Sequence, residues 1–302
     1  MISKVGTVVE NDIQVSEELK RIKRRKKRRE IIRKTILYII ISIGGILAML
    51  PFLWMLSTSL KDSSVVFQIP PQWIPERFAW ENYPNAIKAI PFIRYTFNSA
   101  FITVMKMIGE VFTAALVAYG FARFRFPGRR ILFLILLATI MIPGEITLIP
   151  VFIMFKQIGW IDSFKPLIVP AFFGGSAVFI FFLRQYFASI PKELEEAARI
   201  DGCSSFQIFY KIFLPISKPA LATIAIWSFQ GSWNDLLGPL IYLNSLDKFT
   251  LQIGLTMYQS LNKVEWGQLM AASLLVLLPV LILFFSAQKY FTEGIKLTGI
   301  KG

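Results

Sequence analysis

The 302-residue chain is 55% hydrophobic and only 17% charged, and 33 Lys and Arg against 19 Asp and Glu give it a net charge of +14. Ordinary soluble domains carry about 25% charged residues, so this composition argues against a single soluble domain and for long apolar segments. The chain has no histidine and a single cysteine, which excludes internal disulfides, His-ligated metal sites and His-based nucleophilic catalysis. An enzyme is not excluded, but the usual proton shuttle is absent.

The first 34 residues form a basic arm. They contain twelve Lys and Arg against five Asp and Glu, centred on the run 20–29. Read alone, this run could bind nucleic acid. Because it directly precedes an apolar stretch that begins at Thr35, we interpret it instead as a cytoplasmic anchor beside a membrane span.

Six apolar stretches are long enough to cross a bilayer, which takes about 20 residues. They lie at residues 35–57, 97–121, 131–154, 167–188, 220–243 and 270–291. If the N-terminus is cytoplasmic, the segments on that side hold 24 Lys and Arg and those on the opposite side hold eight. This asymmetry predicts that both termini are cytoplasmic. The expected fold is therefore all-α, a polytopic membrane protein with six transmembrane helices.

Several of these spans contain helix breakers or ionisable groups. Pro143 and Gly144 interrupt the third, Gly174 and Gly175 the fourth, and the stretch 230–239 the fifth. Broken helices and carboxylates at membrane depth are tolerated only where they face protein or a wet cavity. In the second span, Lys106 and Glu110 lie four residues apart on one helical face. We expect them to form a neutralising ion pair, and the wall of a hydrophilic cavity is the alternative.

The segment between the fourth and fifth spans has the clearest helix signals. Pro191 suits a first helical turn, the glutamates that follow favour the positive end of the helix dipole, and Gly202 suits a left-handed stop. Ser204 and Gln207 have the spacing of a capping box, which predicts a second short helix that Pro215 ends. The sequence thus predicts a helix, a glycine turn and a helix over 191–215.

One face of the first of these helices carries mainly small side chains. Leu194, Ala197 and Ala198 are spaced i, i+3 and i+4, so they could sit in the groove of a partner protein. The alternative is an amphipathic helix that rests on the membrane interface. Its acidic first turn and its few basic residues argue against an anionic lipid surface as its main partner.

This segment resembles the EAA motif of ABC importer permeases. Glu196-Ala197-Ala198, then Gly202, Ile212 and Leu214-Pro215 follow the spacing of the motif without departure. Further matches are the run 122–128, Arg184-Gln185, Trp233-Asn234-Asp235 and the ending 288–302, and together they are similar to the carbohydrate-uptake, maltose-type inner permeases. The resemblance covers roughly residues 35–302, so we expect an N-terminal arm over 1–34 and a permease domain over 35–302.

The resemblance implies a multi-pass protein of the bacterial or archaeal inner membrane that performs no bond chemistry. It implies a second homologous permease subunit, two copies of a cytoplasmic ATPase that bind ATP and Mg²⁺, a solute-binding protein and a sugar substrate. This chain is then expected to bind no cofactor, no metal ion and no nucleic acid, and to have no catalytic residues. The resemblance also implies that the cytoplasmic helix over 191–201 is a coupling helix, which inserts in a cleft of the ATPase. The residues implied in ATPase coupling are Leu194, Glu196, Ala197, Ala198, Asp201, Gly202, Ile212, Leu214 and Pro215.

Three further sets of residues follow from the resemblance. The tail, with Gly299, Lys301 and Gly302, is expected at the ATPase pair. Trp233, Asn234, Asp235 and Glu145 are candidates for the substrate pathway, although they could equally stabilise the broken helices. In the loop 244–267, Leu255, Met257 and Tyr258 are candidates for contact with the binding protein, with simple loop packing as the alternative. The loop 61–94, with its five prolines, predicts an ordered, irregular cap.

A different class of protein fits some of these features. A secondary transporter or a channel that works without an ATPase also uses broken spans. It would not explain the helix, glycine turn and helix on the cytoplasmic side. An assembly or signalling protein of the membrane is a third interpretation, and it predicts that function survives the loss of Glu196 or Gly202.

Overall fold

The computed structural model describes residues 2–259 and 264–298, and the side chains of 26–259 and 264–288. In this part of the chain the regular elements are helices, and the only strand-like contact is one bridge between Gln259 and Val264. Four helices are long and apolar enough to cross a membrane, and two bent helix pairs raise the number to six if each pair is one span. The prediction of a helical membrane protein is confirmed, and the predicted six spans lie within this range.

The chain divides into two compact units, residues 1–57 and 58–302. The first unit consists of helix α1 (Ile2–Ser59), which runs without a break through the basic arm and the first predicted span. Its part from Lys26 to Ser59 is a candidate span. No helix end marks the predicted boundary at residue 34, because Lys, Arg, Glu and Ile all continue a helix readily.

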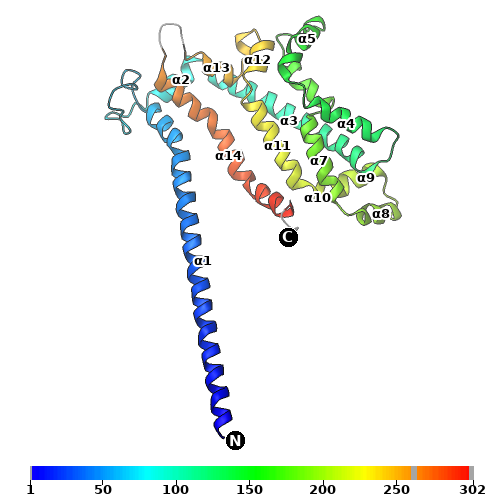
Figure 1. Cartoon of the computed structure of the whole chain (residues 1–302). Coiled ribbons are helices and arrows are strands. Elements are labelled where there is room, and N and C mark those ends of the chain that lie inside the picture. The colour runs from blue at the N-terminus through cyan, green and yellow to red at the C-terminus, as the bar shows by residue number, and fades with distance from the viewer. Residues whose placement is uncertain (1, 260–263, 299–302) are drawn as a thin grey trace. The chain divides into compact units, whose positions relative to one another are not determined.

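Three helices form the centre of the second unit. Helix α3 (Phe92–Arg123) packs against both α7 (Ala177–Ser189) and α11 (Lys218–Trp233), and α14 (Trp266–Thr298) packs against α11 (Figure 1). Ala114, Ala115 and Ala118 are fully buried on α3. Such small side chains let neighbouring helices approach closely, which is how helices associate in a bilayer.

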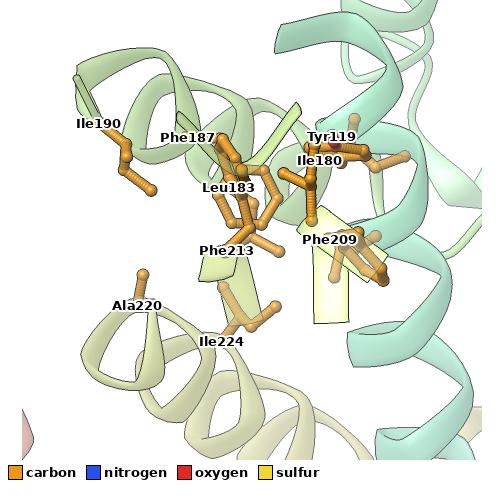
Figure 2. Packing of buried hydrophobic residues seen from close by; sticks show 14 residues of the cluster. Tyr119, Ile180, Leu183, Phe187, Ile190, Phe209, Phe213, Ala220 and Ile224 are labelled. Atoms are coloured by element: carbon orange, nitrogen blue, oxygen red, sulfur yellow. The ribbon is translucent and has the colours of Figure 1, made fainter. Parts of the chain in front are cut away.

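A hydrophobic cluster closes the end of this bundle near the C-terminus of α3. Leu183 and Phe187 from α7 point toward Phe213, and Ala220 and Ile224 approach from α11 (Figure 2). The ring of Tyr119 lies 4.9 Å from that of Phe213 and 5.1 Å from that of Phe209, measured between centroids. The cluster therefore joins three helices of the bundle to the segment between α7 and α11.

The predicted breaks within spans are present. Helices α4 (Arg129–Thr139) and α5 (Gly144–Gln157) meet at a bend of 95°. The fourth span is divided into α6 (Lys165–Ile168), the 3₁₀ turn η1 (Val169–Phe172) and α7, with Gly174 and Gly175 in the break. The fifth is not one helix over 220–243, because α11 ends at Trp233 and α12 (Leu237–Tyr242) begins after a break.

The second short helix does not end at Pro215, so that prediction is wrong. Helix α9 (Ser205–Ile208) continues through a π-turn, η2 (Phe209–Phe213), into α10 (Leu214–Ile216), and Ser217 then separates it from α11 at a bend of 79°. Proline has no N–H to donate, and directly after the π-turn it occupies an initial position of α10, where it is tolerated.

The loop 61–94 is an ordered cap, as predicted. It contains helix α2 (Asn82–Ala89), and the Asn82 side-chain amide donates to the backbone carbonyls of Ser59 and Lys61 at 2.9 and 2.8 Å. Lys61 is buried and donates to the Gln72 carbonyl, and burial lowers the pKa of its ammonium group. The loop 244–267 contains the 3₁₀ turn η3 (Leu246–Lys248) and helix α13 (Leu251–Thr256).

We predict that Gly175→Val destabilises the bundle by about 1–3 kcal/mol, because Gly175 has φ +59° and a Cβ there would lie 2.8 Å from Thr113 Oγ1. The measurement is the unfolding temperature of the protein in detergent. Gly120→Ala is the control, since a Cβ at Gly120 meets nothing within 4 Å. An equal effect of both substitutions would contradict this explanation.

Candidate functional site: the α8 segment and the polar face of α3

The predicted helix, glycine turn and helix is confirmed. Helix α8 (Lys192–Ile200) begins directly after Pro191, and Gly202 adopts the left-handed conformation with φ +79°. The hydroxyl of Ser204 accepts from the Gln207 backbone N–H at 3.3 Å, and the Gln207 side chain accepts from the Ser204 N–H at 2.8 Å. This is the capping box that the spacing predicted.

The two faces of α8 have different surroundings. Glu195 and Ala198 point into the chain, with only 12% of the Glu195 side chain and 6% of Ala198 exposed. The opposite face consists of exposed residues, including an isoleucine that is 87% exposed: Glu193, Glu196, Ala197 and Ile200. Of the predicted face, Leu194 and Ala197 are available to a partner, whereas Ala198 belongs to the chain's own hydrophobic cluster.

A buried arginine fastens α8 to the bundle. The Arg123 side chain is only 4% exposed, and its Nη2 donates to the carbonyls of Phe187 and Ile190 at 2.8 and 2.5 Å. Its Nε lies 3.8 Å from Glu195 Oε2. The guanidinium also lies 4.7 Å from the centre of the Phe213 ring, a cation–π contact. One side chain thus joins the ends of α3 and α7 to α8 and to the π-turn.

Further contacts hold the same segment. Glu195 Oε1 lies 2.8 Å from Nη2 of Arg199, which follows it by one turn of α8. The hydroxyl of Tyr119 donates to the Ser205 carbonyl at 3.2 Å and so connects α3 with the start of α9. Sequence reasoning treated Arg123 only as a basic residue and as part of a matching run. Its position two residues after the apolar span 97–121 was the available signal.

We predict that Arg123→Met loosens α8, because the Phe187 and Ile190 carbonyls lose their donor and Glu195 keeps only Arg199 as a partner, at a cost of about 1–3 kcal/mol. Arg123→Lys should be intermediate, since an ammonium keeps the charge but not the planar fork. The measurement is hydrogen exchange of the α8 amides, which should speed up in both variants. Arg125→Met, at an exposed position, is the control, and unchanged exchange in Arg123→Met would refute the role.

The candidate pathway residues are only partly brought together. Trp233 and Asp235 both line a small hollow between α3 and the end of α11. The Trp233 Nε1–H donates to the Val276 carbonyl at 3.1 Å, and Asp235 Oδ1 accepts from the Gly238 N–H at 3.0 Å. Among the described residues, the exposed Asn234 and Glu145 are not part of its lining.

The predicted ion pair between Lys106 and Glu110 is wrong, and of the two residues that the alternative placed on a cavity wall only Lys106 lines a hollow. Glu110 Oε2 accepts instead from the Ser228 hydroxyl at 2.6 Å, because α11 packs against α3 at this level and offers a neutral donor. Lys106 lines the hollow together with other polar residues, one from α3 and the rest from other parts of the chain. The polar ones are Ser99, Lys106, Ser232, Asp235 and Thr250.

The candidate contacts in the loop 244–267 differ in exposure. Tyr258 is buried and donates to the Ala86 carbonyl at 2.6 Å, and burial raises its pKa to about 12. Leu255 packs against a second hydrophobic cluster, whereas Met257 is 37% exposed. Met257 therefore presents most surface of the three. The tail residues Gly299, Lys301 and Gly302 lie outside the residues that the structure describes.

Asp162 holds two loops together. Its carboxylate accepts from the Lys248 ammonium at 2.8 Å, from the Ser245 hydroxyl at 2.5 Å, and from the backbone N–H groups of Asn244 and Ser245. These donors, led by Lys248, hold the pKa of Asp162 well below its usual range. Sequence reasoning missed this residue. Among the described residues, three or more His, Cys, Asp or Glu do not gather anywhere as a metal site would require.

We predict a pH-dependent effect of Asp162→Asn. Because folding lowers the pKa of Asp162, its ionised form stabilises the fold above about pH 4, and this contribution fades as the pH falls further. The unfolding temperature of the wild type should exceed that of the variant most at pH 6–8, and the gap should narrow below about pH 4. A gap of constant size across this range would contradict the assignment.

Comparison with known proteins gives consistent matches. Residues 110–297 match the family described as binding-protein-dependent transport system inner membrane component. The chain is 34% identical to the arabinooligosaccharides transport system permease protein AraQ of Bacillus subtilis, over 85% of this chain and 92% of that one. It is 31% identical to the diacetylchitobiose uptake system permease protein NgcG of Streptomyces coelicolor, over 81% and 82%.

A solved structure agrees with these matches. The chain is similar to a chain of a bacterial ABC transporter involved in the import of the acidic polysaccharide alginate. The TM-score is 0.76 and the identity 25%, over 87% of this chain and 98% of that one.

Proposed function

Because the chain belongs to the family of binding-protein-dependent transport system inner membrane components, we propose that it forms half of the translocation pathway of an ABC importer for a sugar or oligosaccharide. The observation that carries this proposal is α8, whose exposed face is free while its inner face is fastened to α3 and α7. The names of two relatives, which carry arabinooligosaccharides and diacetylchitobiose, support the substrate class.

We propose that the protein lies in a bacterial or archaeal inner membrane, which it crosses six times, with both termini cytoplasmic. The excess of Lys and Arg on that side of the membrane supports this orientation. Residues 1–34 are the cytoplasmic arm, and 35–302 are the permease domain. The partners are a second permease subunit, two copies of an ATPase that bind ATP and Mg²⁺, and a solute-binding protein. The chain itself then binds no cofactor and makes or breaks no bond.

The coupling role is assigned to both faces of the segment 191–215. On the exposed face, Leu194, Glu196 and Ala197 contact the ATPase, and Ile200 adds an apolar anchor beside them. The remaining predicted residues shape and support the segment: Ala198, Asp201, Gly202, Ile212, Leu214 and Pro215. The tail residues Gly299, Lys301 and Gly302 are proposed to contact the same ATPase pair.

The coupling of ATPase closure to movement of the spans depends on the contacts that hold α8 to the bundle. When the ATPases close, they displace α8, and the contacts of Arg123 carry that displacement to the ends of α3 and α7. Packed helices have discrete arrangements, so the pathway alternates between two states and does not deform gradually. Trp233, Asn234, Asp235 and Glu145 are proposed to face this pathway. Leu255, Met257 and Tyr258 belong to the loop proposed to meet the binding protein.

A secondary transporter or channel is the second candidate, and the broken helices α4–α5 and α11–α12 favour it as much as they favour an importer. The two candidates differ in their need for α8. A protein that works without an ATPase would keep its transport when the exposed face of α8 is changed.

We predict that Gly202→Val and Glu196→Lys uncouple transport from ATP hydrolysis. Gly202 has φ +79°, which a β-branched side chain resists at a cost of about 1–3 kcal/mol. Glu196→Lys puts a positive charge in the first half of α8 and reverses any pairing with a basic groove. Gly202→Asn is the matched control, because asparagine enters the left-handed region more easily and should retain more coupling.

The measurement pairs sugar-stimulated ATPase activity in proteoliposomes with the yield of the co-purified complex. Loss of stimulation with a normal membrane level of this subunit supports the proposal. Full stimulation in both variants would reject it and leave residues 191–215 as an ordinary interfacial connector.

A further inference from the structure

Polar side chains form a stripe along α3. Their successive spacings are four, three, four and three residues, which places them on one face of the helix. The stripe consists of Ser99, Thr103, Lys106, Glu110 and Thr113. Helix α11 packs against α3 and carries Ser228 and Ser232, followed by Asp235 directly after its end. Two neighbouring helices thus contribute to one polar region.

The two ends of the stripe have their hydrogen-bond partners. Ser99 Oγ accepts from the Leu251 N–H at 2.8 Å. At the other end, Glu110 accepts from Ser228, and Thr113 Oγ1 donates to the Gly109 carbonyl at 2.7 Å. These contacts are internal to the chain and account for the polar groups at both ends.

The middle of the stripe is different. Thr103 and Thr250 are 1% and 4% exposed, and their hydroxyls have no hydrogen-bond partner. Lys106 has no ion pair within the part of the chain whose side chains are described. Thr250, which directly precedes α13, lines the hollow together with Lys106 and Asp235, whereas Thr103 is not part of this lining.

Lys106 lies near the middle of its helix. It follows Phe92 by fourteen residues and precedes Arg123 by seventeen, which is about 21 and 25 Å along the axis. An ionised side chain at that depth of a membrane is costly unless it faces a counter-charge, water or a polar ligand. A buried hydroxyl without a partner is unfavourable for the same reason. Asp235 supplies a counter-charge in the same hollow, and the hydroxyls of Thr103 and Thr250 remain without a partner.

The chemistry of the groups limits which ligand they could bind. An ammonium is a donor only, a carboxylate is an acceptor only, and a threonine hydroxyl is both. The positive charge of Lys106 and the negative charge of Asp235 cancel, so the pair has no preference for an ionised ligand. Neighbouring hydroxyls on a sugar ring, each of them a donor and an acceptor, match this set.

We propose that Lys106, Asp235 and Thr250 form a contact site for neighbouring hydroxyls of a neutral saccharide, and that Lys106 determines specificity in the pathway. This inference rests on the proposed function and adds the substrate class. The Trp233 ring in the same lining provides an apolar wall beside the polar groups.

The test uses the complete transporter in proteoliposomes, with its partner permease, ATPases and binding protein. Uptake of arabinotriose and diacetylchitobiose, which are neutral, is compared with uptake of a mannuronate trimer, which is acidic. We expect Lys106→Met and Thr250→Val to raise the KM for uptake of the neutral saccharide about tenfold. Lys106→Arg should restore most of the affinity. Lys156→Met, at an exposed position on α5, should behave as the wild type.

The outcomes separate this inference from the proposed function. If the wild type carries a neutral saccharide and Lys106→Met has the same KM, the contact site is refuted while the importer remains. If the wild type carries only the mannuronate trimer, the neutral class is refuted. If it carries none of the three, the proposed substrate fails together with the site. A normal yield of assembled complex for each variant excludes misfolding as the cause of a raised KM.

Discussion

The end of the bundle beside α8 depends on the contacts of the buried Arg123 guanidinium. The guanidinium caps the final carbonyls of α7, lies against an aromatic ring of the π-turn and faces a carboxylate on α8. A charge buried this deeply is stable only when several partners surround it at once. The Nε of Arg123 has no hydrogen-bond partner, so the two carbonyls at the end of α7 supply its hydrogen bonds and Glu195 supplies a charge at 3.8 Å.

The sequence predicted the helical class and the features that rest on local chemistry. The left-handed glycine at 202 and the capping box at Ser204 follow from backbone geometry and from one side chain reaching its own helix, and both are present. The helix breaks near Gly144, Gly175 and Asp235 were predicted for the same reason. Glycine and proline weaken a helix, although α1 continues through Pro51 and α14 through Pro279.

The features that sequence reasoning missed depend on residues far apart in the chain. Lys106 and Glu110 are close in sequence, but Ser228, 118 residues away, decides which group Glu110 contacts. Arg123 and Asp162 likewise acquire their partners only when distant loops meet. The end of the second short helix was wrong because a π-turn changes what a proline does, and no simple residue pattern announces a π-turn.

The bend of 79° between α10 and α11 has a mechanical consequence. Where two rods meet almost at a right angle, a push along one becomes a sideways force on the other. A displacement of the segment α9–α10 along its own axis would therefore push the Ser217 end of α11 sideways. Since α11 is 16 residues or about 24 Å long and its far end is held by the Trp233 hydrogen bond to α14, such a push would tilt α11 against its neighbours.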